Sequence, residues 1–196
     1  MTRTGRRPGS STTRGDILAA AAEAFSTVGY EATSLRQVAV DARVDPALVR
    51  RFFGGKEALF SAVVTEVFQP EHAVAMLLDG PRSKLGERLL TFVLALLGDV
   101  QNPGPLLGLM RSAATSEPAA AHIRQFLAND MLGKVTQKLG VDQPQLRAAL
   151  AAGQLVGLAI TRYAVRVDAL VDVHQEDLTA WVAPTLQRYL VGRAPA

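Results

Sequence analysis

Cysteine is absent from this 196-residue sequence, and aromatic residues make up only 6% of it. The lack of cysteine excludes disulfides, thiolate metal sites and cysteine nucleophiles. The scarcity of aromatic residues, beside an abundance of alanine, leucine and valine, favours packed helices over a β-sandwich.

Long apolar runs are missing too. No run reaches the roughly 18–20 residues that a membrane span needs, and no apolar segment of the signal-peptide type follows the basic start of the chain. We therefore expect a cytoplasmic protein with no membrane partner.

Motifs of catalysis and metal binding are also missing. The three histidines, His72, His122 and His174, are scattered, and none has a second histidine at metal-ligand spacing. The chain has no glycine-rich phosphate loop, G-x-S-x-G elbow or H-E-x-x-H motif. We expect no enzyme activity, no metal and no cofactor.

The positive charge is concentrated in the first third of the chain. Residues 1–60 hold nine Arg and Lys against six Asp and Glu, and the remainder holds twelve of each sign. A basic segment is typical of a surface that meets a polyanion, although a solvated basic tail would have the same composition. We expect residues 1–12 to be a disordered basic tail.

The rest of the chain is predicted to be helical, because apolar residues recur at helical spacing and none of its segments alternates with period two. The expected helices, about nine in total, span 13–28, 34–42, 46–52, 56–68, 85–97, 105–115, 118–139, 144–169 and 175–191. The predicted fold is all-α: an N-terminal three-helix domain over 13–60 and a larger C-terminal bundle over 61–196, with the connecting helix 56–68 crossing the boundary.

The span from Ser34 to Phe53 has the dimensions of a helix-turn-helix. Ser34 with Gln37 fits a capping box, and Asp45 followed by Pro46 is a second helix start. In the major groove, small residues at the start of the second helix can meet thymine methyls, and arginines can reach guanine edges or phosphates. The alternative is a helical hairpin whose arginines lie in solvent. The candidate DNA-binding residues are Thr33, Ser34, Arg36, Arg43, Asp45, Pro46, Ala47, Leu48, Arg50, Arg51, Phe53 and Lys56.

The stretch AAAEAFSTVGYEATSLRQVAVDARVDPALVRRFFGGKEALF resembles the DNA-binding domain of TetR/AcrR-type transcriptional regulators. The matching residues are Phe25, Gly29, Tyr30, Thr33, Ser34, Val38, Ala39, Val44, Phe53, Lys56, Glu57, Leu59 and Phe60. Three positions depart from the family pattern: Arg43 replaces a glycine in the turn, Arg50 a tyrosine and Phe52 a histidine. Segments such as LRAALAAGQLVGLAITRYAVRVDAL resemble the C-terminal half of an actinobacterial subgroup of these regulators.

The resemblance implies a homodimer formed by the last two helices. Small and apolar residues along both helices suit such an interface, although an ordinary core helix has the same pattern. The candidate interface residues are Ala149, Ala152, Gly153, Val156, Gly157, Ile160, Trp181, Leu186 and Tyr189.

The resemblance also implies a small-molecule pocket inside the bundle. The candidate lining residues are Phe92, Leu96, Leu107, Met110, Arg111, Phe126, Met131, Gln154 and Tyr163. Arg111 lies among apolar residues, and a buried arginine requires a partner: an acidic ligand, or an internal acid such as Glu87 or Glu117. The methionines and aromatic residues could equally be core.

The sequence therefore predicts a DNA-binding regulator. We expect a repressor that binds a near-palindromic operator as a dimer and is released by a small hydrophobic or amphipathic effector. The alternative is a helical ligand-binding or interaction protein that does not bind DNA; salt-dependent affinity for duplex DNA would distinguish the two.

Overall fold

The computed structural model describes residues 10–194, and the described chain is almost entirely helical. Its one β-feature is an isolated bridge between Gly98 and Pro103 in a loop. The all-α fold predicted from the sequence is confirmed. Helix α1 begins at Ser10, so residues 10–12 are helical and the expectation of a tail reaching residue 12 is wrong there. Residues 1–9 of that tail lie outside the described residues.

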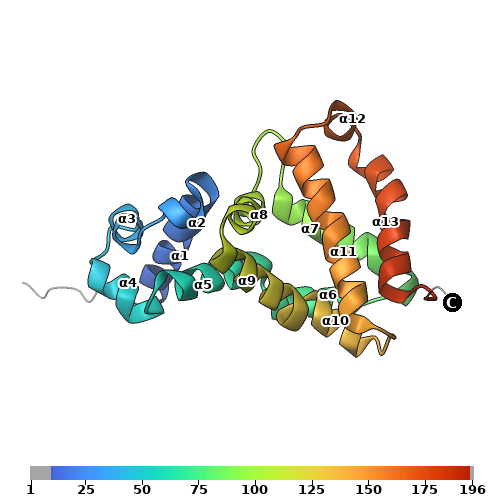
Figure 1. The fold of residues 1–196 in the computed structure, drawn as a ribbon, viewed down its shortest axis with the longest axis horizontal. Coiled ribbons are helices and arrows are strands. Elements are labelled where there is room, and N and C mark those ends of the chain that lie inside the picture. The colour runs from blue at the N-terminus through green and yellow to red at the C-terminus, as the bar shows by residue number, and fades with distance from the viewer. Residues whose placement is uncertain (1–9, 195–196) are drawn as a thin grey trace, which may run out of the picture.

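The first four helices form a compact head at one end of the molecule (Figure 1). They are α1 (Ser10–Thr27), α2 (Gly29–Ala32), α3 (Leu35–Asp41) and α4 (Pro46–Phe53). An aromatic cluster joins the head to the next helix: Phe25 and Tyr30 pack against Phe60, with ring centroids 5.0–5.8 Å apart. Edge-to-face and stacked rings of this kind stabilise the packing beyond the area they bury.

Helix α5 (Lys56–Phe68) leads from the head to the rest of the chain. It ends at Gln69, whose φ of 45° is left-handed, and Pro70 then begins α6 (Pro70–Leu78). The residue pattern predicted no separate helix in this segment, and α6 adds one to the expected count.

The remaining elements form a bundle on the far side of α5 (Figure 1). They are η1 (Arg82–Lys84), α7 (Leu85–Leu97), α8 (Pro105–Thr115), α9 (Glu117–Gln125), η2 (Phe126–Asp130), α10 (Leu132–Lys138), α11 (Pro144–Ala159), η3 (Ile160–Ala164), α12 (Asp168–Val171) and α13 (Gln175–Val191). Helices α3, α4, α5, α7, α8 and α13 start and end within one residue of their predicted bounds. The predicted helix 118–139 is divided into α9, a π-helical turn η2 and α10. Likewise, 144–169 is divided into α11, the π-helical turn η3 and part of α12.

Helices α7 and α13 pack closely enough to exclude a side chain at Gly86. A Cβ there would overlap the carbonyl oxygen of Ala183. The amide of Gln187 fixes the same contact, because its oxygen accepts from the Gly86 N–H at 2.7 Å and its nitrogen donates to the Arg82 carbonyl at 2.8 Å.

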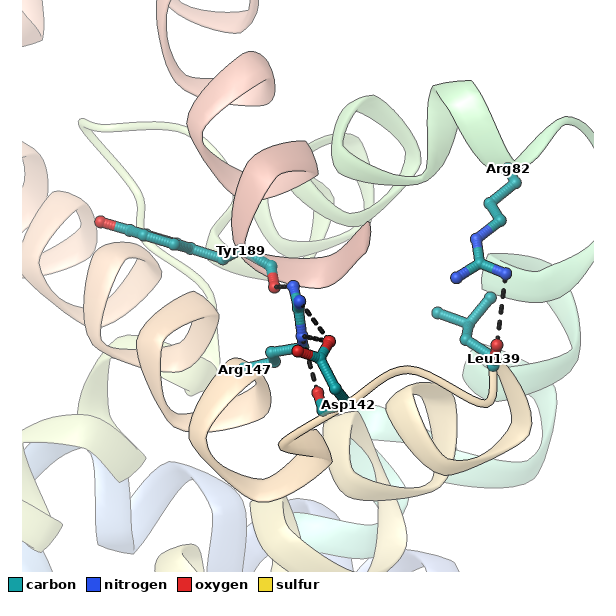
Figure 2. A network of polar contacts seen from close by, with 5 residues as sticks. All are labelled: Arg82, Leu139, Asp142, Arg147 and Tyr189. Carbon is teal, nitrogen blue, oxygen red and sulfur yellow. Dashed lines mark hydrogen bonds and ion pairs between the residues drawn. The ribbon is translucent and has the colours of Figure 1, made fainter. Parts of the chain in front are cut away.

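A buried arginine holds the end of α13 against the start of α11. Arg147 donates to the Asp142 carboxylate and carbonyl, and its Nη1 donates to the Tyr189 carbonyl at 2.8 Å (Figure 2). Arg147 is only 7% exposed, and its guanidinium is thus satisfied on both sides. The buried arginine was predicted at Arg111, which is exposed; that prediction is wrong.

Candidate nucleic-acid interface

The turn between α3 and α4 is built by local hydrogen bonds that the sequence predicts. The Ser34 hydroxyl accepts from the Gln37 N–H at 3.1 Å and caps α3. The Asp45 carboxylate accepts from the Ala47 N–H at 2.7 Å and caps α4, while Pro46 occupies the first turn. Asp45 therefore acts as a helix cap, and its negative charge makes it a poor phosphate contact.

Helix α4 has one buried and one exposed face. Val49 and Phe53 anchor it to the head, with exposed fractions of 0% and 8%. Its outer side presents Pro46, Ala47, Arg50 and Arg51, all exposed, with Leu48 half-buried between the two faces. Arg36 and Arg43, from α3 and the turn, are also exposed. We call these seven residues the head surface.

Three of the predicted DNA-binding residues make contacts within the head: Thr33 and Phe53 are buried, and Lys56 is half-buried. The Thr33 side chain is buried, and its hydroxyl donates to the Gly29 carbonyl at 2.7 Å. Phe53 is packed in the core. The Lys56 ammonium donates to the Glu31 carbonyl at 2.9 Å and lies 4.6 Å from the centre of the Tyr30 ring. The Thr33 hydroxyl is thus bonded within the head, and the Lys56 ammonium makes one hydrogen bond and one cation–π contact there, so these residues stabilise the head.

Arg14 is a cation beside α4 that was counted in the charge of the first third but not among the candidate contacts. Its guanidinium lies 5.4 Å from the centre of the Phe53 ring, and the residue is exposed. Sequence spacing could not indicate this position, because α1 and α4 meet only in the folded head. Elsewhere in the head, beside Phe25 and Phe60, burial raises the pKa of the Tyr30 phenol, and the carboxylates of Glu57 and Glu31 raise it further.

Helix α8 joins the head to the bundle. A Cβ at Gly108 would overlap the backbone of Ser26, so α8 crosses α1 in direct contact. The buried Ser112 hydroxyl donates to the Phe25 carbonyl at 3.1 Å. At the end of the helix, the Ser116 hydroxyl donates to the Glu31 carboxylate at 2.6 Å. The Ser26 hydroxyl also donates to the Pro105 carbonyl at 3.3 Å, so close packing and three hydrogen bonds fasten α8 to α1 and α2.

The opposite side of α8 borders a cavity inside the bundle. The cavity has a volume of about 50 Å³ and is lined by thirteen residues, all apolar. Leu106 and Met110 line it from α8, Phe126 and Met131 from η2 and the residue after it, and Phe68 from the end of α5. The Phe68 and Phe126 ring centroids are 4.9 Å apart.

Three of the nine predicted pocket residues line this cavity: Met110, Phe126 and Met131. Leu107 is buried elsewhere in the core, while Phe92 and Leu96 are half-buried outside the lining. Gln154 lines a groove on the outer side of α11. Tyr163 donates to the Gly98 carbonyl at 3.1 Å, and burial raises the pKa of its phenol. Arg111 is exposed, so a ligand salt bridge at this residue is not supported.

The outer side of α11 and α13 carries exposed apolar residues. Leu146 and Leu150 are 53% and 43% exposed, and Trp181 on α13 is 82% exposed. A groove between the helices is lined partly by Gly153, Gly157 and Trp181. Among the predicted interface residues, Ala149, Gly153, Gly157, Ile160 and Trp181 are exposed, and Tyr189 is half-buried. Leu186 is fully buried within the protomer, and Ala152 and Val156 line the internal cavity.

The described residues offer no metal centre and no membrane span. Among residues 10–194, the acidic and histidine side chains form no group of three or more that could hold a metal ion. In the same part of the chain, every helix is too short or too polar to cross a membrane.

The capped α3–α4 pair, braced by α1 and carrying exposed arginines, defines a helix-turn-helix protein with an attached helical bundle. Comparisons with known proteins agree. The family model described as "Bacterial regulatory proteins, tetR family" matches residues 17–63, and "Tetracyclin repressor-like, C-terminal domain" matches residues 83–190. The chain belongs to the TetR family of transcriptional regulators, as the sequence motifs predicted.

Solved structures of similar fold extend over almost the whole chain. A TetR-family regulator from Streptomyces coelicolor A3 is 29% identical, with a TM-score of 0.62 over 95% of this chain and 99% of its own. A tetR family regulator from Shewanella sp. PV-4 is 18% identical, with a TM-score of 0.68 over 89% of this chain and 95% of its own. A TetR-like regulator from Rhodococcus sp. RHA1 is 17% identical, with a TM-score of 0.62 over 94% and 96%. A search of curated proteins gave no match.

Proposed function

We propose that this DNA-binding regulator is a repressor, which occupies a near-palindromic operator as a homodimer and leaves it when a small molecule enters the bundle. The observation that supports DNA contact most directly is the arrangement of α4. Its apolar face is buried, while Pro46, Ala47, Arg50 and Arg51 face solvent. A helix with small residues at its start and arginines beyond them can enter a major groove and reach bases or phosphates.

The proposed dimer doubles this contact. A single head reads one short half-site, and a two-fold axis places a second α4 about one helical turn of DNA away. The exposed apolar residues of α11 and α13 support this face as the interface, because Leu146, Leu150 and Trp181 would otherwise stay in water. This face lies at the far end of the molecule from the head (Figure 1).

The proposed coupling runs through α8 as well as α5. One side of α8 borders the cavity through Leu106 and Met110, and the other contacts α1 through Gly108 and Ser112. Phe68, at the end of α5, lines the same cavity. A ligand that displaces these residues would move the head relative to the bundle. Release from DNA requires that the ligand bind the DNA-free arrangement more tightly than the DNA-bound one.

This proposal divides the chain into a DNA-binding part over 13–60 and a ligand-binding and dimerisation part over 61–196. The proposed place of action is the cytoplasm, at the nucleoid while the protein is bound to DNA.

The proposal is tested by fluorescence anisotropy with labelled duplex DNA from upstream of the protein's own gene. Unrelated duplex of equal length is the control. A regulator binds the upstream duplex in preference to the control, with an affinity that falls as salt rises because phosphate contacts release counterions. If the protein shows no preference for the upstream duplex, and selection from random duplexes also gives no preferred sequence, the proposed function is wrong.

A further inference from the structure

The cavity between α5, α8, η2 and α11 contains no group that could pair with a polar ligand. All thirteen lining residues are hydrocarbon or thioether side chains. Arg111, which could have supplied a charge, is exposed on another face of α8. A carboxylate, an ammonium or a hydrogen-bonding group placed here would lose its water without gaining a partner. The lining therefore favours ligands that carry no polar groups.

The cavity is also smaller than the molecules that such a lining attracts. Its volume is about 50 Å³, whereas a dry apolar cavity of about 150 Å³ holds a benzene molecule. A ligand with a six-carbon body must push the walls apart. The side chains best able to yield are Met110 and Met131, because methionine is unbranched and adopts many rotamers.

The wall that carries Met131 is itself irregular. Residues Phe126–Asp130 form a π-helical turn, and Met131 follows with φ −124° and ψ −96°. A Cβ at Gly133 would overlap the carbonyl of Ala128, so this bend requires glycine. A π-helical turn leaves the regular hydrogen-bond pattern of an α-helix and often occurs at functional sites. Here it brings both Phe126 and Met131 to the cavity.

We propose that this cavity binds an uncharged, apolar molecule without hydrogen-bonding groups, which enters by displacing Met110 and Met131. The regulatory consequence rests on the proposed function: displacement of Met110 moves α8, whose other side holds the head. Occupancy by a ligand of this class is independent of whether the protein binds DNA.

Methionine methyl NMR tests the class of ligand directly. The chain has four methionines, and ¹³C-methyl labelling reports Met110 and Met131 in the cavity, with Met76, which does not line it, as an internal control. The probes are benzene, pyridine, which has the same ring with one hydrogen-bond acceptor, and benzoate. We expect benzene to shift the Met110 and Met131 signals and leave Met76 in place. Pyridine should require at least about tenfold higher concentration, and benzoate should have no effect.

A variant whose cavity is filled by a larger side chain is the matched control for ligand binding. Ala152 lines the cavity, so Ala152→Leu should remove the benzene response, while Ala95→Leu on the exposed side of α7 should keep it. Ala152→Val makes a smaller change and serves if the leucine variant does not fold. Unmoved Met110 and Met131 signals, or a response to benzoate at the concentration that suffices for benzene, would overturn the inference. A benzene response in a protein that fails the DNA test would overturn the proposed function alone.

Discussion

Arg43 holds a left-handed backbone conformation at the turn between α3 and α4, with φ of 55°. An L-amino acid with a Cβ is strained there by about 1–2 kcal/mol, and glycine is not. The sequence marks Arg43 as a departure from a glycine pattern but could not show the dihedral angle. The same residue contributes a positive charge beside α4, because its exposed guanidinium lies on the surface proposed to face DNA.

Arg43→Gly should therefore stabilise the protein and weaken its DNA binding. Relief of the left-handed strain exceeds the extra entropy that glycine loses on folding, so we expect a gain of about 0.5–1 kcal/mol in the free energy of unfolding. Urea unfolding measures it, and anisotropy measures the affinity for DNA. Arg43→Lys is the control and should change neither quantity much. A glycine variant less stable than the wild type would show that the turn depends on the arginine side chain.

Local residue patterns predicted the helix caps, but they could not predict which individual side chains are buried. Ser34, Asp45 and Pro46 act within a few residues along the chain, so their roles follow from sequence. Arg111 and Arg147 lie on helices rich in apolar residues, where the repeat does not show which side faces the core. Only the partners of Arg147, the Asp142 carboxylate and the distant Tyr189 carbonyl, show which of the two is buried.

At the scale of helices, the bounds of α5, α7, α8 and α13 were predictable because proline and glycine lie at or just beyond their ends. The two π-helical turns were not predicted, because each continues a helical segment that contains no proline beyond its first turn, and the contact of Gly133 with Ala128 exists only in the folded chain. The close crossing of α1 and α8 could not be predicted from the sequence for another reason. Gly108 within an apolar helix reads as a weak helix former, and its packing against Ser26 exists only after folding.

Two glycine-to-alanine substitutions should have opposite effects on stability. Gly15 lies in α1 with open space around it, so Gly15→Ala should stabilise the protein by about 0.5–1 kcal/mol through helix propensity. Gly108→Ala would force α8 away from Ser26 and should destabilise it by about 1–3 kcal/mol.

Thermal and urea unfolding of both variants check this pair of predictions. The Gly108 variant should also bind DNA less tightly in the absence of any ligand, because the joint between head and bundle is displaced. If both variants gained stability equally, α1 and α8 would not be packed as described.

For the whole molecule, the sequence predicted a helix-turn-helix at the N-terminus and a bundle behind it, and the described chain has this arrangement. The sequence could not show which residues of α11 and α13 face the core and which face solvent. Leu186 is buried within the protomer, while Trp181, earlier in the same helix, is 82% exposed. Both helices are apolar on more than one side, which suits the proposed interface as well as packing in the core.

Trp181 gives the sharpest test of the dimer. Trp181→Glu should convert a dimer into a monomer, because two carboxylates would replace two indole rings in an apolar interface. Val28→Glu, an equally charged change at an exposed residue of the head, should leave the dimer intact. Sedimentation velocity measures both. A Trp181 variant that remained dimeric at the same concentration would place the interface elsewhere.

The proposed function depends on DNA binding through the head surface, and above all through helix α4. Its decisive measurement is the salt dependence of DNA affinity for the Arg50→Ala, Arg51→Ala double variant. Lys134→Ala with Lys138→Ala removes the same charge from α10, far from the head, and is the control. We expect the arginine variant to bind more weakly, with a slope against salt shallower by about one for each phosphate that an arginine no longer reaches. Its unfolding temperature should stay unchanged, because both arginines are exposed. If both double variants kept the wild-type affinity and slope, α4 would not be the DNA-binding helix.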